Sequence, residues 1–343
     1  MSTSMKRFGT IAAVALMCVP APAAHAQSPT ARIVRAATGF IATLDAAQKQ
    51  RVQFAFDDEQ QRVRWSNLPT SFVKRGGLNM GELSAAQRTA ALALVASALS
   101  KRGYEKVLQM VEADEVLKSN ERNNPMFGKD LYYISILGAP SEKSPWMLQF
   151  GGHHLALNIT IVGAEGVLTP SLTGAQPALY TVQGRTVRPL GQENDKAFAL
   201  LNALDSAQKA QAILTYRVTD LVLGPGQDGK TIQPEGLKAT AMNAKQRAML
   251  LDLVGEWTGI VHESAAAARM TEIKAGLDST WFAWSGPTSA EPGKNGSAYY
   301  RIQGPKLVIE YAPQRMGGDP SMHIHTIYRD PTNDYGRKVA AAK

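Results

Sequence analysis

The chain has 343 residues, 44% of them hydrophobic and 19% charged, which is enough for two ordinary domains around a sizeable core. Its one cysteine, Cys18, lies in a segment that we expect to be removed, so disulfides, zinc–thiolate sites and cysteine nucleophiles are excluded from the mature chain. Removing Lys6 and Arg7 with that segment lowers the net charge from +8 to +6. The remaining basic residues are scattered, which argues against nucleic-acid binding.

The first 26 residues have the three parts of a secretory signal peptide. Lys6 and Arg7 precede an apolar run from Ile11 to Val19, and Ala24-His25-Ala26 forms an A-x-A cleavage motif. The run is shorter than the roughly 20 apolar residues of a membrane-spanning helix, and no later run reaches that length. We expect cleavage near Ala26, export to the periplasm or beyond, and no membrane span.

Residues 27–343 contain an internal repeat. Three segments recur in the same order: Leu44–Lys49 as Leu204–Lys209, Gly77-Leu78 as Gly236-Leu237, and Tyr132–Ile159 as Trp281–Tyr311. A repeat of this kind indicates two copies of one structural unit. Each copy predicts a short helix, a loop, a longer helix, often a third helix, and then a run of strands.

Local signals support these elements. Ser84 is a helix N-cap with Gln87 at the capping-box position, and Leu155, Leu157 and Ile159 alternate as in a strand. Hairpin turns are expected at residues 139–141 and, in the second copy, at Gly286-Pro287.

A Pro/Gly-rich region from Gly163 to Gly191, with short strand-like pieces such as residues 180–182, separates the copies near Pro189. We therefore predict an α+β protein with a first lobe at 27–189 and a second at 190–343. The two lobes are expected to pair about a pseudo-two-fold axis, forming one mixed or antiparallel sheet flanked by helices.

Histidines are the most informative residues for function because they are few and clustered. Once His25 is set aside with the signal peptide, His153-His154 and His323-Ile324-His325 hold four of the remaining five. In a strand, His323 and His325 point to one face, and one of the other two can join them. His154, His323 and His325 are therefore the predicted ligands of zinc, copper or iron.

The two copies differ where this site is expected. His153 and His154 correspond to Pro305 and Lys306, and Asn158 corresponds to Glu310. One asymmetric site at the lobe interface fits this divergence. His153 and Glu310 are candidates for an alternate ligand or general base, and the fork-shaped guanidinium of Arg329 for orienting a substrate anion.

Asp220 and Asp228, around a glycine-rich loop, are further residues that could border the site. A metal-free cluster of hydrogen-bonded histidines stays open as an alternative.

Several longer strings resemble the bacterial exported family catalogued as domain of unknown function 3500. They are Arg64–Pro69, Gly151–Leu155, Asp220–Gly229, Tyr300–Pro305 and His323–Gly336. The resemblance spans nearly the whole mature chain. It implies one domain over both lobes and carries no activity with it.

Three functional hypotheses follow from these residues. The first is an exported metal-binding protein that acts as a metal-dependent hydrolase on a small molecule or an envelope component. The second is a non-catalytic periplasmic binding protein for an anionic or sugar ligand, and the third is a structural or assembly factor. Bound metal with an open coordination position favours the first, and ligand-dependent stabilisation without turnover favours the second.

Overall fold

The computed structural model describes residue 1 and residues 28–316 and 318–341, so the predicted signal peptide and Cys18 lie outside the described residues. The elements up to residue 187 are α1 (Pro29–Ala42), α2 (Ala46–Val52), β1 (Gln53–Phe54), α3 (Glu59–Arg62), β2 (Leu78–Asn79), α4 (Ala85–Ala98), α5 (Lys101–Asn120), β3 (Tyr133–Leu137), β4 (Trp146–Gly151), β5 (Leu155–Val162), β6 (Glu165–Ala175), β7 (Tyr180–Val182) and β8 (Arg185–Val187).

The later elements follow a similar order. They are α6 (Gly191–Asn202), α7 (Ser206–Ala212), β9 (Leu237–Lys238), α8 (Ala244–Thr258), α9 (Glu263–Ala275), β10 (Trp281–Ser285), β11 (Tyr299–Gly304), β12 (Leu307–Pro313), β13 (Ile324–Arg329) and α10 (Arg337–Ala341). Short 3-10 turns precede α4 at Met80–Glu82 and α8 at Ala239–Ala241.

One 11-stranded sheet forms the centre of the molecule, in the order β1-β3-β4-β5-β6-β13-β12-β11-β10-β9, with β2 beside β3. The β1–β3 pair is parallel and the other named pairs are antiparallel, so the sheet is mixed. The two halves of the chain meet where β6 pairs with β13, with Thr173 opposite Thr326. The predicted α+β class and mixed sheet are confirmed.

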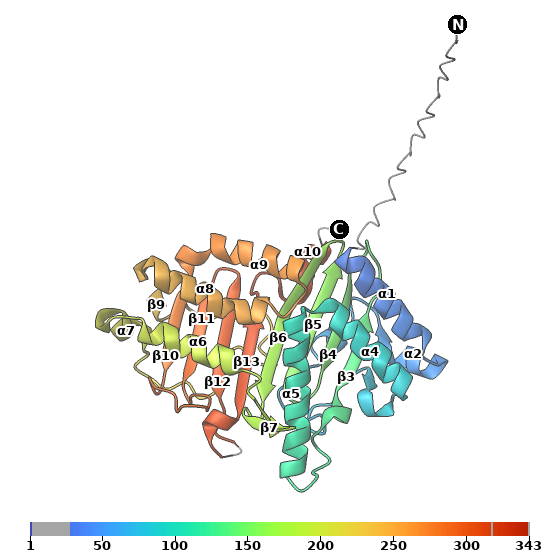
Figure 1. Cartoon of the computed structure of the whole chain (residues 1–343), viewed down its shortest axis with the longest axis horizontal. Helices are drawn as coiled ribbons and strands as arrows, with labels where there is room; N and C mark the ends of the chain where they lie inside the picture. Colours follow the sequence, from blue (N-terminus) through green and yellow to red (C-terminus); the bar gives the residue numbers. More distant parts are fainter. Residues whose placement is uncertain (2–27, 317, 342–343) are drawn as a thin grey trace.

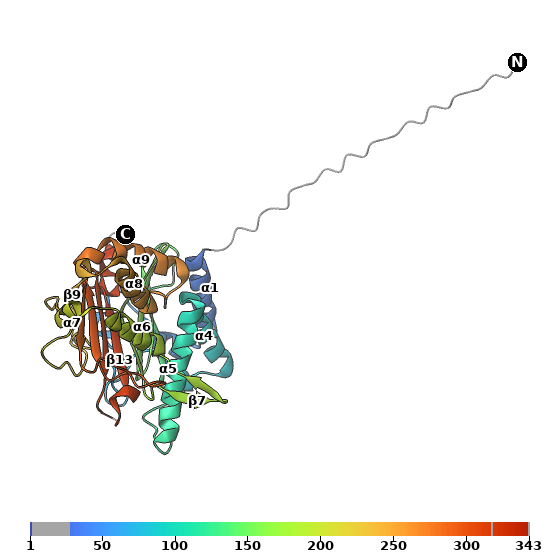
Figure 2. The same ribbon diagram turned by 60° about the vertical axis from the view of Figure 1, so that its left-hand side comes forward.

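The large helices α1, α4, α5, α6, α8 and α9 cover one face of the sheet (Figures 1 and 2). The main hydrophobic core lies between this helix layer and the sheet, and the fully buried Trp257, Trp284 and Tyr300 belong to it. A smaller core around Trp65, Ile327 and Tyr335 also packs against strand residues. Among the described residues, no helix is long and apolar enough to cross a membrane.

Helix starts are fixed by capping boxes at matching places in both halves. The Ser84 hydroxyl accepts a hydrogen bond from Gln87 N, and Gln87 Oε1 accepts one from Ser84 N. These two bonds confirm the predicted helix start. Asn243 and Gln246 do the same for α8. These bonds satisfy amides that the first helical turn leaves unpaired.

The region 163–191 differs from the separator that its composition predicts. Residues 165–175 form β6, a long strand in the middle of the sheet. Pro170 is tolerated because the β5–β6 register shifts between Leu157 and Ile159, and the Asn158 side chain donates to Pro170 O at 2.8 Å. Only the later part of the region is the loop with the short strands β7 and β8.

Buried charges also join the two halves. Lys106 on α5 donates to Glu193 on α6 at 2.5 Å and to Glu256 on α8 at 3.2 Å, and all three side chains are at least nine-tenths buried. Arg102 and Lys196 add further ion pairs to Glu256. The helix layer is therefore tied across the chain midpoint by a polar network inside a largely apolar interface.

Candidate metal centre

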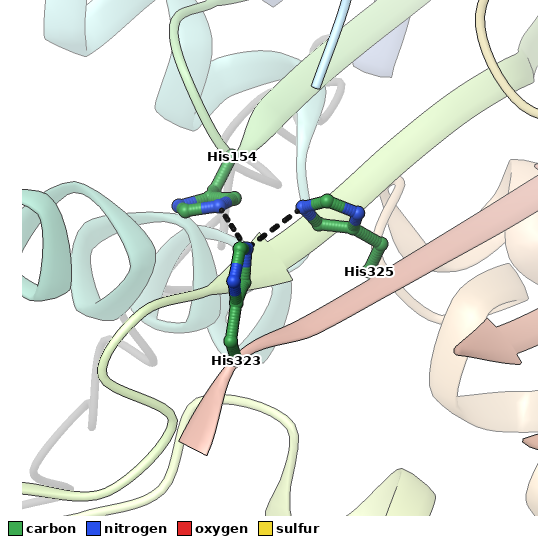
Figure 3. A group of neighbouring side chains, drawn as sticks. All are labelled: His154, His323 and His325. Carbon is green, nitrogen blue, oxygen red and sulfur yellow. Dashed lines mark hydrogen bonds between the residues drawn. The ribbon is translucent and has the colours of Figure 1, made fainter. Parts of the chain in front are cut away.

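The chain places the two histidine clusters at the same end of the central strands. His154 immediately precedes β5, and His323 immediately precedes β13, whose second residue is His325. Because β6 pairs with both β5 and β13, the two clusters lie across that one strand from each other. Figure 3 shows the three rings turned toward a common point.

Short local contacts hold the loop that carries His153 and His154. Gly152 N donates to Leu155 O at 2.9 Å, and the Arg75 guanidinium donates to Gly152 O at 2.8 Å. The sequence argument assumed that these histidines lie in a strand, and that condition is not met, because the chain bends at both residues before β5 begins. Their rings instead lie together, with centroids 3.6 Å apart.

Gly174 on β6 forms one wall of the site. A Cβ at this position would lie 3.3 Å from the Cδ2 atoms of both His154 and His325 and 2.7 Å from Ile324 O. The close approach of the two rings therefore requires a residue without a side chain at this place in the strand.

Three imidazole nitrogens meet at the centre. His323 Nε2 lies 3.0 Å from His154 Nε2 and 3.1 Å from His325 Nε2. The three rings offer ligand atoms within 4.8 Å of one another, and all three residues are buried. Tetrahedral zinc with bonds of about 2.1 Å needs ligand nitrogens about 3.4 Å apart, so the spacing is close to that of a zinc site.

The opposite nitrogen of each ring faces an oxygen or an amide. His323 Nδ1 is 2.7 Å from Met316 O, and His154 Nδ1 is 3.6 Å from Asp114 Oδ1. His325 Nδ1 is 3.1 Å from the Asn67 amide nitrogen and 4.0 Å from Asp220 Oδ1. The Met316 carbonyl is a partner of the kind that orients the ring of a metal-binding histidine and fixes its tautomer, here with the proton of His323 on Nδ1.

The electrostatics keep these rings neutral. Burial, together with the neighbouring imidazoles, holds the pKa of His154 well below its usual value. Burial likewise lowers the pKa of His323 to about 4 and that of His325 below its usual value. Near neutral pH each ring therefore has one N–H and one lone pair, the form in which histidine binds metals.

Glu310 and Arg329, the other predicted site residues, are committed to protein partners. Glu310 accepts from Val222 N at 2.9 Å and Leu223 N at 2.7 Å, and also from the Tyr299 hydroxyl at 2.6 Å. Arg329 donates to Leu223 O, Gly224 O, Asp228 and Asp334. Both side chains hold the loop that contains Asp220 and Asp228. Their link to the histidines is Asp220, which faces His325.

Asp114, Asn67 and Met316 also belong to the site but were not predicted from the sequence. Asp114 lies on α5 among apolar residues of the buried helix face and is 3.0 Å from His153 Nδ1. The sequence signal for Asp114 is a carboxylate on an otherwise apolar helix face, and histidine clustering alone does not reveal it. Asn67 and the Met316 carbonyl carry no comparable pattern.

The fold and the site together define an α+β protein with a buried cluster of histidine and aspartate side chains that could hold a metal ion. The chain belongs to the family described as Protein of unknown function (DUF3500), whose profile matches residues 26–337. No curated protein and no solved structure matches the chain.

Proposed function

We propose that this chain is an exported metal-binding protein that holds a divalent cation through His154, His323 and His325. The observation that carries the proposal is the lone-pair count at His323. Its Nδ1 must donate to the Met316 carbonyl, so Nε2 has one lone pair and two nitrogens within 3.1 Å. One lone pair accepts at most one N–H, so one of these contacts is unfavourable unless a cation lies between the nitrogens.

Ligand chemistry limits the cation to a few choices. Neutral imidazoles without thiolates suit zinc, copper or iron, and three protein ligands leave one tetrahedral position for a water or substrate. A bound zinc ion would lower the pKa of such a water to about 7, which is the basis for proposing a metal-dependent hydrolase. His153, whose ring centroid lies 3.6 Å from that of His154, is the neighbouring side chain that we propose as a base toward that position.

The proposal gives Glu310 and Arg329 positioning roles. Their hydrogen bonds fix residues 222–224, which follow Asp220 in the chain. Asp220 in turn faces His325. Glu310 and Arg329 therefore act on the site through the loop that carries Asp220, and they are not metal ligands in this proposal.

Elemental analysis of protein purified without an affinity tag tests the metal site. At least one zinc, copper or iron ion per chain is expected, and the His323→Ala/His325→Ala double variant should lose it while keeping its circular dichroism spectrum. His262→Ala is the matched control, because His262 bonds to Ser264 and belongs to neither cluster. Failure of the wild-type chain to take up any of these ions after reconstitution would refute the proposal.

A second candidate function, binding of an anionic ligand, is favoured by a cleft of about 800 Å³. The cleft is lined by Arg51, Arg64, Lys74 and Arg75 against one acidic residue, Glu82. Arg51 pairs with Glu82, and Arg75 is bound to carbonyl oxygens, including Gly152 O. The anion would bind next to the loop of His154. Stabilisation of the protein by a carboxylate or phosphate ligand, lost in Arg64→Ala/Lys74→Ala, tests this candidate.

We also propose that the chain is exported and that its two halves arose by duplication. The N-terminal signal supports export. A gene duplication that produced lobes 27–189 and 190–343 is supported by the repeated order of elements and by the matching capping boxes of α2 and α7 and of α4 and α8.

A further inference from the structure

We infer that a second divalent cation binds beside the first, held by Asp114, His153 and His154, so that the His154 ring bridges two metal ions. The inference rests on the proposed function, because the bridge needs a metal at His154 Nε2. It adds a binuclear centre in which α5 of the helix layer supplies a ligand that neither histidine cluster contains.

The geometry of this second group matches that of the first. Asp114 Oδ1 lies 3.0 Å from His153 Nδ1 and 3.6 Å from His154 Nδ1. The three side chains offer ligand atoms within 4.8 Å of one another and are all buried. These spacings lie on either side of the roughly 3.4 Å expected between ligand atoms of a tetrahedral zinc ion.

Two buried atoms in this group have no hydrogen-bond partner among the residues that the structure describes. They are Asp114 Oδ2 and His154 Nδ1. Leaving a buried polar atom unpaired costs about 1–3 kcal/mol, and more for a charged group. Two such atoms on adjoining side chains, in a group that already has metal-ligand spacing, indicate a ligand that satisfies both.

The charge at Asp114 supports the same conclusion. Its side chain is 1% exposed, and within the described part of the chain its ion-pair partners are His153 and His154 and not a lysine or arginine. Buried carboxylates are normally paired with a cation or coordinate a metal. A divalent cation at this place would neutralise the carboxylate and use the free oxygen.

Bridging has a defined proton balance. His154 carries one N–H when neutral, and coordination through both ring nitrogens requires that this proton leave for solvent. Metal binding generally releases protons from ionisable ligand groups, and the bridge adds the remaining imidazole proton to that release. The two cations together bring a charge of +4 against Asp114 and the bridging imidazolate, so the assembled centre keeps a net positive charge that can attract an anionic substrate.

Titration with copper(II) of the metal-free, untagged full chain separates the possible outcomes. Two ions per chain are expected. The electron paramagnetic resonance signal should grow with the first equivalent and weaken with the second, because copper ions joined by an imidazolate couple antiferromagnetically. A signal that keeps growing to two uncoupled spins per chain would overturn the bridge.

Stoichiometry separates this inference from the proposed function. One ion per chain would overturn the second site and leave the three-histidine site standing, whereas no binding would overturn both. Asp114→Asn and His153→Gln should each reduce uptake from two ions to one, and His262→Gln should keep two. Two independent variants are used so that a folding defect in one does not decide the result, and retention of two coupled ions in both would also overturn the inference.

Discussion

His154 Nε2 lies 3.0 Å from His323 Nε2, although 169 positions separate the two residues in the chain. The contact exists because β6 pairs with β5 on one side and with β13 on the other. Each half of the chain contributes one histidine cluster, so the candidate centre forms only when both halves complete the common sheet. Binding at the centre should therefore stabilise the whole fold.

Zinc should raise the thermal stability of the wild-type chain but not of His323→Asn. A ligand that binds only the folded state stabilises it by about 4 kcal/mol at 1,000 times its Kd. Asparagine removes the central nitrogen, so the variant should lose most of the zinc-dependent rise in Tm while its metal-free Tm changes little. Calorimetry with zinc and with a chelator measures both values. An equal zinc-dependent shift in the variant would exclude His323 as a ligand.

Asp220→Asn should weaken zinc binding without abolishing it. The Asp220 carboxylate faces His325 Nδ1 at 4.0 Å and is held by Gln314 at 3.0 Å. Loss of a residue that orients a metal-binding histidine typically costs 10–100-fold in affinity. Competition with a zinc-binding dye should show a Kd raised by about this factor at unchanged stoichiometry. Asp252→Asn, an exposed carboxylate on α8, is the control, and equal affinities in all three proteins would contradict the prediction.

The buried charges on α5, α6 and α8 predict two opposite dependences on pH. Burial opposes ionisation of Glu256, but Lys106, Lys196 and Arg102 outweigh it and lower its pKa below 4.5. Ionised Glu256 therefore adds stability above pH 4.5 that disappears as the pH falls through its folded-state pKa. Glu256→Gln should lose about 3–5 kcal/mol of unfolding free energy at pH 7, and the loss should shrink below pH 4.5.

Glu193→Gln is the matched comparison. Burial raises the pKa of Glu193 despite its contact with Lys106. Its stabilising contribution is therefore fully present below pH 4.5 and declines as the pH rises through the raised pKa. Relative to wild type, this variant should become more stable as the pH rises, the reverse of Glu256→Gln. Urea unfolding at pH 3 to 8 covers the range below pH 4.5 for Glu256 and the range above it for Glu193, and slopes of the same sign would refute the assignment.

Much of the fold could be predicted because local chemistry specifies it. Capping residues such as Ser84 and Gln87 act within one helical turn, and alternation at Leu155, Leu157 and Ile159 reports a strand directly. β6 was missed because a proline and several glycines usually mark loops. What admits Pro170 here is a register shift and a side-chain bond from Asn158 on the neighbouring strand, which are tertiary features.

The candidate site was predictable only in part, for a similar reason. Three clustered histidines are visible in the sequence, and the chain brings His154, His323 and His325 together. Asp114 comes from a helix 39 residues before His153, and its role depends on how α5 packs on the sheet. Glu310 and Arg329 stood out by residue type, but their hydrogen bonds to the loop at 222–224 depend on the complete fold.

Two glycines at matching places in the halves should be irreplaceable. Gly77 and Gly236 both have φ of +95°, and an added Cβ would lie 2.1 Å from Ile134 O or 2.3 Å from Phe282 O on the adjoining strand. Alanine at either position meets both a disfavoured backbone conformation and a backbone clash, so a loss on the order of 2–4 kcal/mol is expected. Gly39→Ala, on the exposed side of α1 three residues before its end and with no described atom within 4 Å of an added Cβ, should instead gain about 0.5–1 kcal/mol. The urea midpoints of the three variants test this contrast. Similar losses of stability at positions 77 and 236 mean that both halves need the same backbone geometry before β2 and β9. A loss of stability at only one position would mean that the two halves form this turn differently.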